Sequence, residues 1–393
     1  MTTPNPGMDP DTFAQFHAQL ERYVRDRLVP AEPEVIANDG IPDTLLAEMR
    51  EMGLFGLTMP EEYGGAGMNV TQYIETIHTL SYAMPAYRSI TSINLGMVCS
   101  AIKNFGLPDQ KAQWLPRLAA GEIASFGLTE PGSGSDSAGL QTMAVRSGNG
   151  YVLNGTKRYI TNAPFAKVAL IMARTSRENL PKNGHISAFI VPLDTAGVTR
   201  GKSDKKMGQS GSHIGDLILE DVFVPGDALL GGEEGRGFAI AMQSLDNGRL
   251  SVGAASTGYA RRILDTAVRY ATERKAFGEP IANFQLIQAM LADSQAELYA
   301  AQCMMRDAIA KADQRGKVLM EAAAFKMFAS EMCGRVADRC VQIHGGAGYL
   351  AEYEAERFFR DSRIYRIYEG TTQIMQLVIA KQMLRDFANG GLA

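Results

Sequence analysis

Apolar positions recur every three or four residues from about residue 9 to residue 124, in stretches such as TLLAEMREMGLFGL, VTQYIETIHTLSYA and QKAQWLPRLAAG. This spacing gives a helix one apolar face, so the first part of the chain is predicted to be all α-helical. Between about residues 125 and 235 the pattern changes to short β-type runs, including VALIMART, ISAFIVPL and DLILEDVFVP, bounded by Gly, Pro, Asn and Asp. From about residue 236 onward, long Ala- and Met-rich stretches return to helical spacing. They are apolar on more than one face, which indicates a bundle that also packs against another subunit.

These patterns predict an α+β fold of three domains: an N-terminal all-α domain at residues 9–124, a middle β-barrel or sandwich-like domain at 125–235, and a C-terminal α domain at 236–393. Residues 1–8 are predicted to form a disordered N-terminus. Within the middle domain, YVLNGTKRYI is expected to be a hairpin whose two-residue turn is Asn154-Gly155. Strands and helices do not alternate, so a doubly wound parallel sheet is not expected.

Composition narrows the class of protein. With 46% hydrophobic and 21% charged residues the chain is ordinary for a globular protein, and its net charge of -4 argues against a nucleic-acid-binding surface. The four cysteines are scattered, without a C-x-x-C pair or a histidine at metal-ligand spacing, so we expect reduced thiols and no metal site. The first residues show no secretory signal, and no apolar stretch is long enough to span a bilayer. These features predict a cytoplasmic protein without membrane insertion.

One carboxylate near the end of the chain raises a chemical question. In IYEGTTQIM, Glu369 lies between Tyr368 and Gly370 and has hydrophobic residues on both sides. A structural interpretation is a helix start, since Thr371 or Thr372 could cap the helix that follows. The alternative is a general base in an apolar pocket, where desolvation raises the pKa of a carboxyl group toward neutrality. This stretch alone favours the structural interpretation.

Two glycine-rich stretches are candidate ligand loops. FGLTEPGSGSDSAG (126–139) joins the helical and β regions, and Gly132 and Gly134 allow its amides to line a concavity for an anion or a flavin edge. It is neither a P-loop nor a dinucleotide fingerprint, and its structural alternative is a surface loop. QIHGGAGYLAEYEAERFFRD (342–361) contains a His-Gly-Gly sequence like the oxyanion loop of some esterases. The chain has no Gly-x-Ser-x-Gly elbow, which excludes that class, and a helix end is the alternative.

Taken in order along the chain, these motifs resemble those of the acyl-CoA dehydrogenase family, from about residue 13 to the end. The first signature is GLTEPGSGSDSAG (127–139), and the second runs from Gln342 to Asp361. The other matching segments are YITN (159–162), LDNGR (245–249), RKAFGEPI (274–281) with FQ (284–285), and YEGTTQ (368–373). The resemblance implies an α domain, a middle β domain and a C-terminal four-helix α domain, assembled as a homotetramer.

By the same resemblance, the chain would bind FAD between the β domain and the C-terminal bundle. Leu128, Thr129 and Ser135 would line the isoalloxazine and pyrophosphate, while Tyr159 and Thr161 would cover the other face of the flavin near N5. Many relatives have Trp where this chain has Tyr159. The adenosine diphosphate half would lie against two subunits, in a site made of Arg274, Phe277, Gln285, Gln342, Gly345, Gly346, Thr371 and Gln373.

The implied reaction is the conversion of an acyl-CoA to its trans-2-enoyl-CoA. A thioester α-proton is a very weak acid, so the reaction needs a positioned carboxylate, a polarised carbonyl and a hydride acceptor facing Cβ. The resemblance assigns the first role to Glu369 and the third to N5 of FAD. Gly370 lets the backbone approach the substrate, and the amide of Glu369 would supply half of the oxyanion hole. One branch of the family carries its base at the position of Gly248, where glycine cannot serve.

Substrate contacts are also implied by the resemblance. Ser135, Asp246 and Arg249 would lie along the CoA pantetheine, although Asp246 and Arg249 are three residues apart on one helix and could instead form a structural ion pair. Arg88 resembles the arginine that pairs with the distal carboxylate in glutaryl-CoA dehydrogenases. Its alternative is a solvent-facing or structurally paired arginine.

The predicted function is therefore FAD-dependent dehydrogenation of a short- to medium-chain acyl-CoA, with a dicarboxylic acyl group left open and an electron-transfer flavoprotein as electron acceptor. Three alternatives stay open: a flavin oxidase or monooxygenase of the same fold, a glutaryl-CoA-type oxidative decarboxylase, and a binding protein that has lost turnover. An acid at position 369 argues against the monooxygenases, which generally lack it.

Overall fold

The N-terminal region is helical, as the apolar spacing predicts. The computed structural model describes residues 5–316 and 318–391. In this part of the chain the first seven α-helices are α1 (Pro10–Tyr23), α2 (Glu32–Asn38), α3 (Asp43–Glu51), α4 (Val70–Leu80), α5 (Pro85–Ser92), α6 (Ser100–Phe105) and α7 (Pro108–Ala119). A π-helical segment, Val24–Leu28, extends α1, and a second, Ile93–Cys99, joins α5 to α6. Such segments are rare and often occur at functional sites.

The predicted disordered segment, residues 1–8, lies only partly in the described chain, because residues 1–4 fall outside it. The remainder is hydrogen-bonded. The Asn5 side chain donates to the carbonyl of Gly67, and the amide of Met8 donates to Oε1 of Gln72, which also completes the capping box at the start of α4. These contacts fix residues 5–8 against the helical region.

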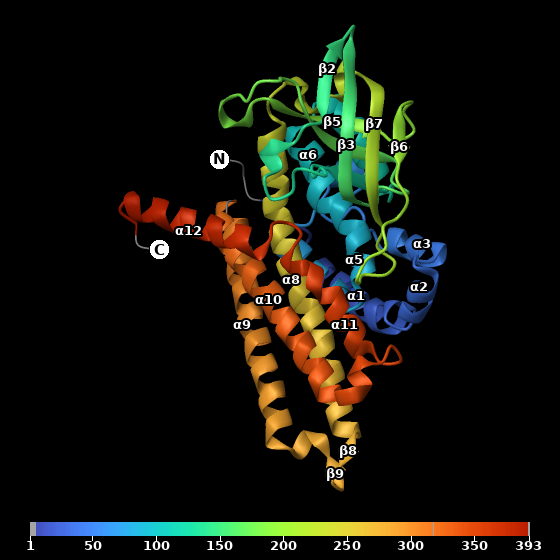
Figure 1. Cartoon of the computed structure of the whole chain (residues 1–393), viewed down its shortest axis with the longest axis vertical. Coiled ribbons are helices and arrows are strands. Elements are labelled where there is room, and N and C mark those ends of the chain that lie inside the picture. The colour runs from blue at the N-terminus through green and yellow to red at the C-terminus, as the bar shows by residue number, and fades with distance from the viewer. Residues whose placement is uncertain (1–4, 317, 392–393) are drawn as a thin grey trace.

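The middle region is one curled seven-stranded sheet, shown at the top of Figure 1. Its strands are β1 (Ala124–Gly127), β2 (Met143–Ser147), β3 (Gly150–Thr161), β4 (Val168–Arg174), β5 (Ile186–Pro192), β6 (Val198–Arg200) and β7 (Ile214–Pro225). The hydrogen-bonded order is β1-β4-β2-β3-β7-β6, with β5 paired to β4. The pair β1 and β4 is parallel, whereas β3 is antiparallel to both β2 and β7.

The hairpin predicted at Asn154-Gly155 is wrong. Residues 150–161 form one continuous strand, and the turn lies earlier, between Ser147 and Gly150. Asn154 instead sits at a bulge opposite β7, where its side chain bonds Asp221, 67 residues away. Gly155 has φ of 149°, and a Cβ there would overlap Thr142. Pairing with β7 therefore overrides the local turn preference.

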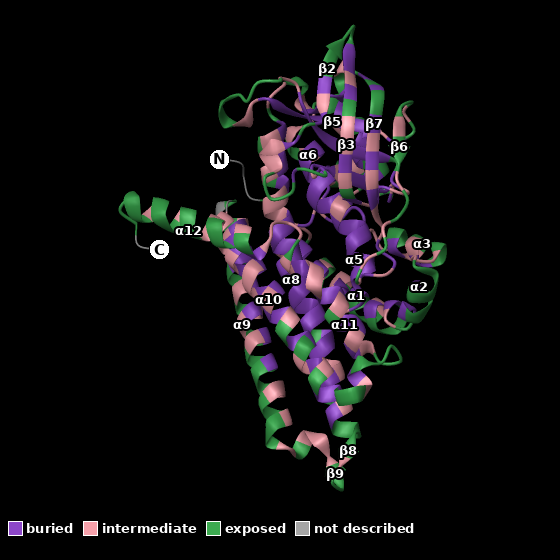
Figure 2. Cartoon of the chain, in the orientation of Figure 1, coloured by how far each residue is buried: buried purple, intermediate pink, exposed green. Residues whose placement is uncertain are grey.

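The C-terminal region is a bundle of long helices. The elements are α8 (Gly237–Glu273), the small hairpin of β8 (Lys275–Ala276) and β9 (Glu279–Pro280), α9 (Gln285–Arg315), α10 (Leu319–His344), α11 (Glu354–Ser362) and α12 (Thr372–Ala388). Short 3₁₀ turns occur at Glu61–Tyr63, Ser137–Gly139, Pro181–Asn183, Gly226–Ala228, Leu230–Gly232, Ile281–Asn283, Gly345–Tyr349 and Arg363–Arg366. Figure 2 shows α8 largely buried, whereas the projecting end of α12 is largely exposed.

Small residues allow α8 to run through the middle of the molecule. Gly253 lies against the ring of Phe325 on α10, and Gly258 lies against the carbonyl of His78 on α4. At 37 residues and 1.5 Å per residue, α8 is roughly 55 Å long and reaches from β5, where Gly237 packs on Ser187, to the β8–β9 hairpin. The predicted fold class, with a helical, then a β, then a helical domain, is confirmed. The domain limits at residues 124 and 235 stay predictions. Among the described residues, the helices include none with the length and apolarity needed to cross a bilayer.

Candidate active site

Glu369 lies in the turn between α11 and α12, outside both helices. Its φ is 55° and that of Gly370 is 91°, so two consecutive residues adopt left-handed backbone angles. Thr371 is the cap of α12, because its Oγ1 accepts a hydrogen bond from the amide of Ile374 at 3.2 Å. Capping is thus performed by Thr371, and it does not account for the acid at position 369.

The Glu369 carboxyl group is buried against α8. A Cβ built on Gly248 would lie 2.8 Å from Cδ of Glu369, so only glycine at position 248 leaves room for the carboxylate. The Oε2 atom is buried and has no hydrogen-bond partner in the described part of the chain. Burial raises the pKa of Glu369, while the positive charges of Arg88, Arg249 and Lys326 act to lower it. The result is a desolvated carboxyl group surrounded by three cationic side chains.

Arg88 on α5 is only 5% exposed. Its Nη2 donates to Oγ of Ser251 at 2.9 Å and its Nη1 to the hydroxyl of Tyr368 at 3.4 Å, while the buried Nε finds no partner among residues 5–316 and 318–391. Within the described residues, none of the ion pairs joins Arg88 to a carboxylate. The structure therefore excludes the solvent-facing alternative and leaves a buried guanidinium bonded to neutral hydroxyls.

Asp246 and Arg249 form the ion pair that their spacing allows. The Nη1 atom of Arg249 lies 2.6 Å from Oδ1 of Asp246, and the arginine side chain is 8% exposed whereas the aspartate is 43% exposed. Arg249 also lies close enough to Glu369 to lower the pKa of that carboxyl group. The structural interpretation of the pair is therefore observed, and contact with CoA stays a prediction.

Two residues of this site were not predicted. Ser251 on α8 bonds Arg88, and Lys326 on α10 donates to the carbonyl of Gly370 at 2.6 Å. Lys326 is fully buried, and its sequence context, AAAFKMFAS, does carry a signal: a single charged residue in an apolar stretch.

The flavin-contacting candidates of the β domain lie together. The carbonyl of Thr129 accepts from the amide of Arg158, and that of Leu128 accepts from the buried Lys157 at 3.4 Å, so residues 128–129 run beside 157–158. The carbonyl of Thr161 accepts from Oγ of Ser125 in β1. Tyr159 has φ of 61° and a side chain that is 58% exposed. Ser135 lies on the exposed loop that follows residues 128–129 in the sequence.

This surface presents an exposed aromatic ring, that of Tyr159. An exposed aromatic side chain held in an unusual backbone conformation suits stacking on a cofactor. Built Cβ atoms at Gly132 and Gly134 would meet nothing within 4 Å, so the loop leaves open space beside Tyr159's strand. The buried Glu130 fixes this loop, since its carboxylate accepts from Lys157, Thr142 and the amide of Gln141.

The candidates for the adenosine half lie at the other end of the molecule. In Figure 1 the β8–β9 hairpin is at the end of the bundle opposite the sheet. Stacking of His344 on Tyr270 brings the end of α10 to the same end of α8. Phe277 is 97% exposed, and the other exposed members of this group are Arg274, Gln285, Gln342, Gly345 and Gly346. Thr371 and Gln373 lie instead at the start of α12. One chain therefore does not bring the two halves of the predicted FAD site together.

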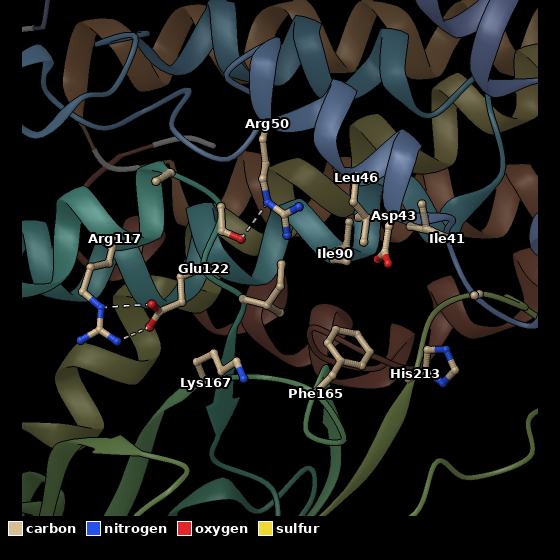
Figure 3. A pocket seen from close by; sticks show the side chains of 15 residues that line it. Ile41, Asp43, Leu46, Arg50, Ile90, Arg117, Glu122, Phe165, Lys167 and His213 are labelled. Carbon is tan, nitrogen blue, oxygen red and sulfur yellow. Dashed lines mark hydrogen bonds and ion pairs between the residues drawn. The ribbon is translucent and has the colours of Figure 1, made fainter.

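A separate cavity of about 710 Å³ lies between the N-terminal helices and the sheet (Figure 3). Its charged groups are partly satisfied already: Arg117 is bonded to Glu122, and Nε of Arg50 donates to the carbonyl of Gly121. Phe165 and His213 stack edge to face on its other side. None of the predicted site residues lines this cavity, so we assign it no role in the chemistry of Glu369.

Comparison with known sequences gives matches along most of the chain. Family profiles described as the N-terminal, middle and C-terminal domains of acyl-CoA dehydrogenase match residues 10–122, 125–222 and 235–384. The chain is 39% identical to the human mitochondrial short-chain specific acyl-CoA dehydrogenase, over 96% of this chain and 91% of that protein. It is also 39% identical to CarC of the caffeyl-CoA reductase–Etf complex of Acetobacterium woodii, over 90% and 92% of the two chains.

Solved structures agree with these matches. Butyryl-CoA dehydrogenase of Megasphaera elsdenii superimposes with a TM-score of 0.90 at 35% identity, covering 96% of this chain and 99% of that one. An acyl-CoA dehydrogenase of Bacillus anthracis complexed with FAD gives 0.90 at 36%, covering 99% and 70%. A glutaryl-coenzyme A dehydrogenase–glutaryl-CoA complex gives 0.91 at 30%, covering 96% of each chain.

Proposed function

The chain belongs to the acyl-CoA dehydrogenase family, and we propose that it oxidises a short-chain acyl-CoA to the trans-2-enoyl-CoA with Glu369 as the base. Members of this family are FAD-dependent oxidoreductases, and this chain is one of them. When bound, FAD supplies the acceptor for the hydride that leaves Cβ. The observation that carries the proposal is the buried, unpartnered carboxyl oxygen of Glu369 lying over Gly248.

The surroundings of Glu369 suit proton abstraction. Loss of water raises the pKa of the carboxyl group, and a carboxylate with a higher pKa is a stronger base toward the thioester α-proton. Three cations in the same site favour the ionised form that the reaction needs. Desolvation therefore raises the basicity of the carboxylate, and the three cations oppose part of that rise.

The thioester carbonyl also needs a hydrogen-bond donor. In the described part of the chain, the amide of Glu369 donates to no backbone carbonyl of the turns and loops. The positive φ of Glu369 and Gly370 turns this peptide away from helical pairing. We assign this amide to the substrate carbonyl, where it would stabilise the negative charge that develops as the α-proton leaves.

FAD binding would need a second copy of the chain. Leu128, Thr129, Ser135, Tyr159 and Thr161 would hold the flavin half in the β domain. The adenosine half would lie on the residues near the β8–β9 hairpin, which α8 separates from the sheet by roughly 55 Å in one chain. We therefore propose that two subunits complete each cofactor site, as in the homotetramer that the family resemblance implies.

The acyl group and the electron acceptor are proposed from the relatives. The names of the human and M. elsdenii proteins specify short-chain acyl-CoA and butyryl-CoA, which supports a substrate of about that size. The CarC relative is a subunit of a complex that includes Etf, which supports an electron-transfer flavoprotein as the partner. Contact of Ser135, Asp246 and Arg249 with CoA belongs to the same proposal.

An anaerobic titration of the purified holoenzyme with butyryl-CoA tests this function. We expect stoichiometric bleaching of the flavin absorbance and formation of the 2-enoyl-CoA. An unchanged flavin spectrum with butyryl-, hexanoyl- and octanoyl-CoA would contradict the proposal. Rapid oxygen consumption with acyl-CoA alone would favour the oxidase alternative instead.

Arg88 favours a second candidate, oxidation of a dicarboxylic acyl-CoA with or without decarboxylation. A buried guanidinium that is bonded to hydroxyls and not to a carboxylate is well suited to an anionic acyl tail. The similarity to a glutaryl-CoA complex supports the same idea.

Turnover of glutaryl-CoA and of butyryl-CoA, measured in the wild type and in Arg88→Met, tests this candidate. Selective loss of glutaryl-CoA turnover, by about 100-fold or more, would support the candidate, since losing a buried charged partner costs several kcal/mol. Equal effects on both substrates would end it.

A further inference from the structure

Of the three cationic side chains near Glu369, Lys326 is the one that the sequence did not predict. It lies in the middle of α10 with no exposed surface, and its only hydrogen bond among the described residues is the one to the carbonyl of Gly370. A buried ammonium group is costly unless it satisfies a specific need of the structure or the chemistry. The acceptor indicates what that need is, because it is the carbonyl of Gly370, the residue directly after the proposed base.

The same helix holds the two flanks of the Glu369 turn. Glu331, also on α10, accepts from Oγ1 of Thr372 at 2.7 Å and from Nη1 of Arg366 at 3.1 Å. Arg366 and Thr372 lie three residues on either side of Glu369. The Lys326 bond to Gly370 falls between these two anchor points, so α10 holds the turn at residue 366 before Glu369 and at residues 370 and 372 after it.

The backbone of this turn makes the central bond necessary. A left-handed angle is readily adopted by Gly370 but is sparsely populated for a non-glycine residue, so the surrounding structure must enforce it at Glu369. Holding the Gly370 carbonyl fixes the orientation of the peptide that follows it. Together with the Glu331 bonds to Arg366 and Thr372, it restrains the backbone on both sides of Glu369, and with it the amide and side chain of that residue.

The charges that face Glu369 come from three helices. Arg88 on α5, Arg249 on α8 and Lys326 on α10 each act to lower the pKa of the carboxyl group, and the hydroxyls of Tyr73 and Tyr368 lie within its field. Each arginine is bonded to other side chains, Arg88 to Ser251 and Tyr368, and Arg249 to Asp246. Burial lowers the pKa of Lys326 to about 8, an effect that the charges of Glu369 and Glu331 oppose and that of Arg249 reinforces.

We propose that Lys326 is a positioning residue for the reaction: by donating to the Gly370 carbonyl it orients the amide and carboxylate of Glu369, and by its charge it favours the ionised carboxylate. This inference rests on the proposed function of Glu369. It separates into two parts, a hydrogen bond that sets geometry and a charge that sets the pH at which the base is available.

Two substitutions separate those parts. Lys326→Met removes the hydrogen bond and the charge, whereas Lys326→Gln removes the charge and keeps an N–H donor on a side chain that is one bond shorter. Lys103→Met is the matched control, because Lys103 is another largely buried lysine whose Nζ donates to a backbone carbonyl, that of Thr58. Lys103 is not among the groups that shift the pKa of Glu369.

The first measurement is the pH profile of kcat/KM with butyryl-CoA. Activity rises as Glu369 ionises, so loss of a positive charge raises its pKa and moves the acidic limb to higher pH in both Lys326 variants. On the pH-independent plateau, Lys326→Met should lose roughly 10- to 100-fold in kcat, since small displacements of reacting groups cost that much. Lys326→Gln should recover a large part of that loss. Lys103→Met should change neither quantity.

The second measurement does not require dehydrogenation. Acetyl-CoA has α-protons but no Cβ hydrogen, so exchange of its methyl protons in D₂O, followed by NMR, reports on the base alone. Lys326→Met should slow this exchange as much as it slows turnover. An acidic limb that stays at the wild-type pH in both Lys326 variants, or that moves equally in Lys103→Met, overturns the inference. Failure of the proposed function looks different: Glu369→Gln would then retain wild-type exchange and turnover.

Discussion

The turn at Glu369-Gly370 and the turn at Phe277-Gly278 have almost the same φ angles but opposite surroundings. In each, a non-glycine residue with φ near 55° precedes a glycine with φ near 90°: 55° and 91° in the first, 53° and 89° in the second. The first turn is enclosed by α5, α8 and α10 of its own chain. The second is the tip of the β8–β9 hairpin, where the Phe277 side chain is 97% exposed.

Each of the two turns presents a side chain, and the packing around the turn determines whether that side chain is buried and reactive or exposed and free to bind. At position 369 burial makes a carboxyl group a stronger base. At position 277 an exposed aromatic ring, in edge-to-face contact with Phe284, is available to a ligand or a second chain. Substitutions in the two turns should therefore affect different properties, catalysis in one case and assembly with FAD in the other.

The largest effect is expected from Glu369→Gln. The amide has nearly the shape of the carboxyl group but cannot accept the α-proton, so kcat/KM should fall by about 10²–10⁴-fold while the yellow holoprotein persists. Steady-state kinetics and the flavin spectrum measure the two quantities. The exposed Glu352→Gln, a similar change away from the turn, should have no effect. Near-normal activity of Glu369→Gln would refute the assignment of the base.

Gly248→Ala should give the next largest effect. The added methyl group would overlap the Glu369 carboxyl group, which must then move away from the substrate. We expect kcat to fall by roughly 10- to 100-fold with little loss of bound FAD, again because small displacements are costly in catalysis. Gly334→Ala is the control, since a methyl group there would meet Arg366 only at an ordinary 3.5 Å. Equal activities of the two variants would show that the carboxylate does not depend on glycine at position 248.

The sequence predicted the parts of this comparison that depend on local pattern. Helical and β spacing identified the three regions, and the motif resemblance selected Glu369 and Phe277 as candidates whose roles stay predictions. It failed where distant segments decide. The expected turn at Asn154 became a bulge because β7 pairs with it, and Ser251 and Lys326 were missed because their contacts join residues 163 and 44 positions apart. The difference in burial between the turns at Glu369 and Phe277 likewise depends on tertiary packing.

A change at Phe277 should have a smaller effect, of a different kind. Phe277→Ser removes a side chain that is almost fully exposed, so the isolated chain should fold with nearly unchanged stability. FAD retention and the oligomer should weaken by about tenfold, the usual effect of losing an aromatic contact of 1–2 kcal/mol. Gel filtration with light scattering and the flavin-to-protein absorbance ratio measure both. Val145→Ser, an exposed apolar change on β2, serves as the control. An unchanged oligomer with full FAD would remove the hairpin from the cofactor site.

The smallest effect concerns stability, and it tests whether the Glu369 turn is costly to the fold. The pKa of Glu369 is raised in the folded protein because desolvation outweighs the attraction of Arg88, Arg249 and Lys326. A group with a raised folded-state pKa favours folding below its unfolded-state value, and that contribution is lost as the pH rises through the folded-state value. Glu369→Gln, which never ionises, should therefore match the wild type near pH 4 and become more stable by about 0.5–2 kcal/mol above neutrality, as is common when a functional group is removed.

Chemical denaturation at several pH values measures this difference, with Glu352→Gln as the control because that side chain is exposed and lies away from the turn. A Glu369→Gln variant that is less stable than the wild type at pH 8 would mean that attraction between the carboxylate and the three cations stabilises the fold by more than burial of the carboxylate destabilises it. The turn would then be a stabilising ion cluster. The expected sign instead identifies a carboxylate kept in place at the expense of stability, which is the physical difference between this turn and its exposed counterpart at Phe277.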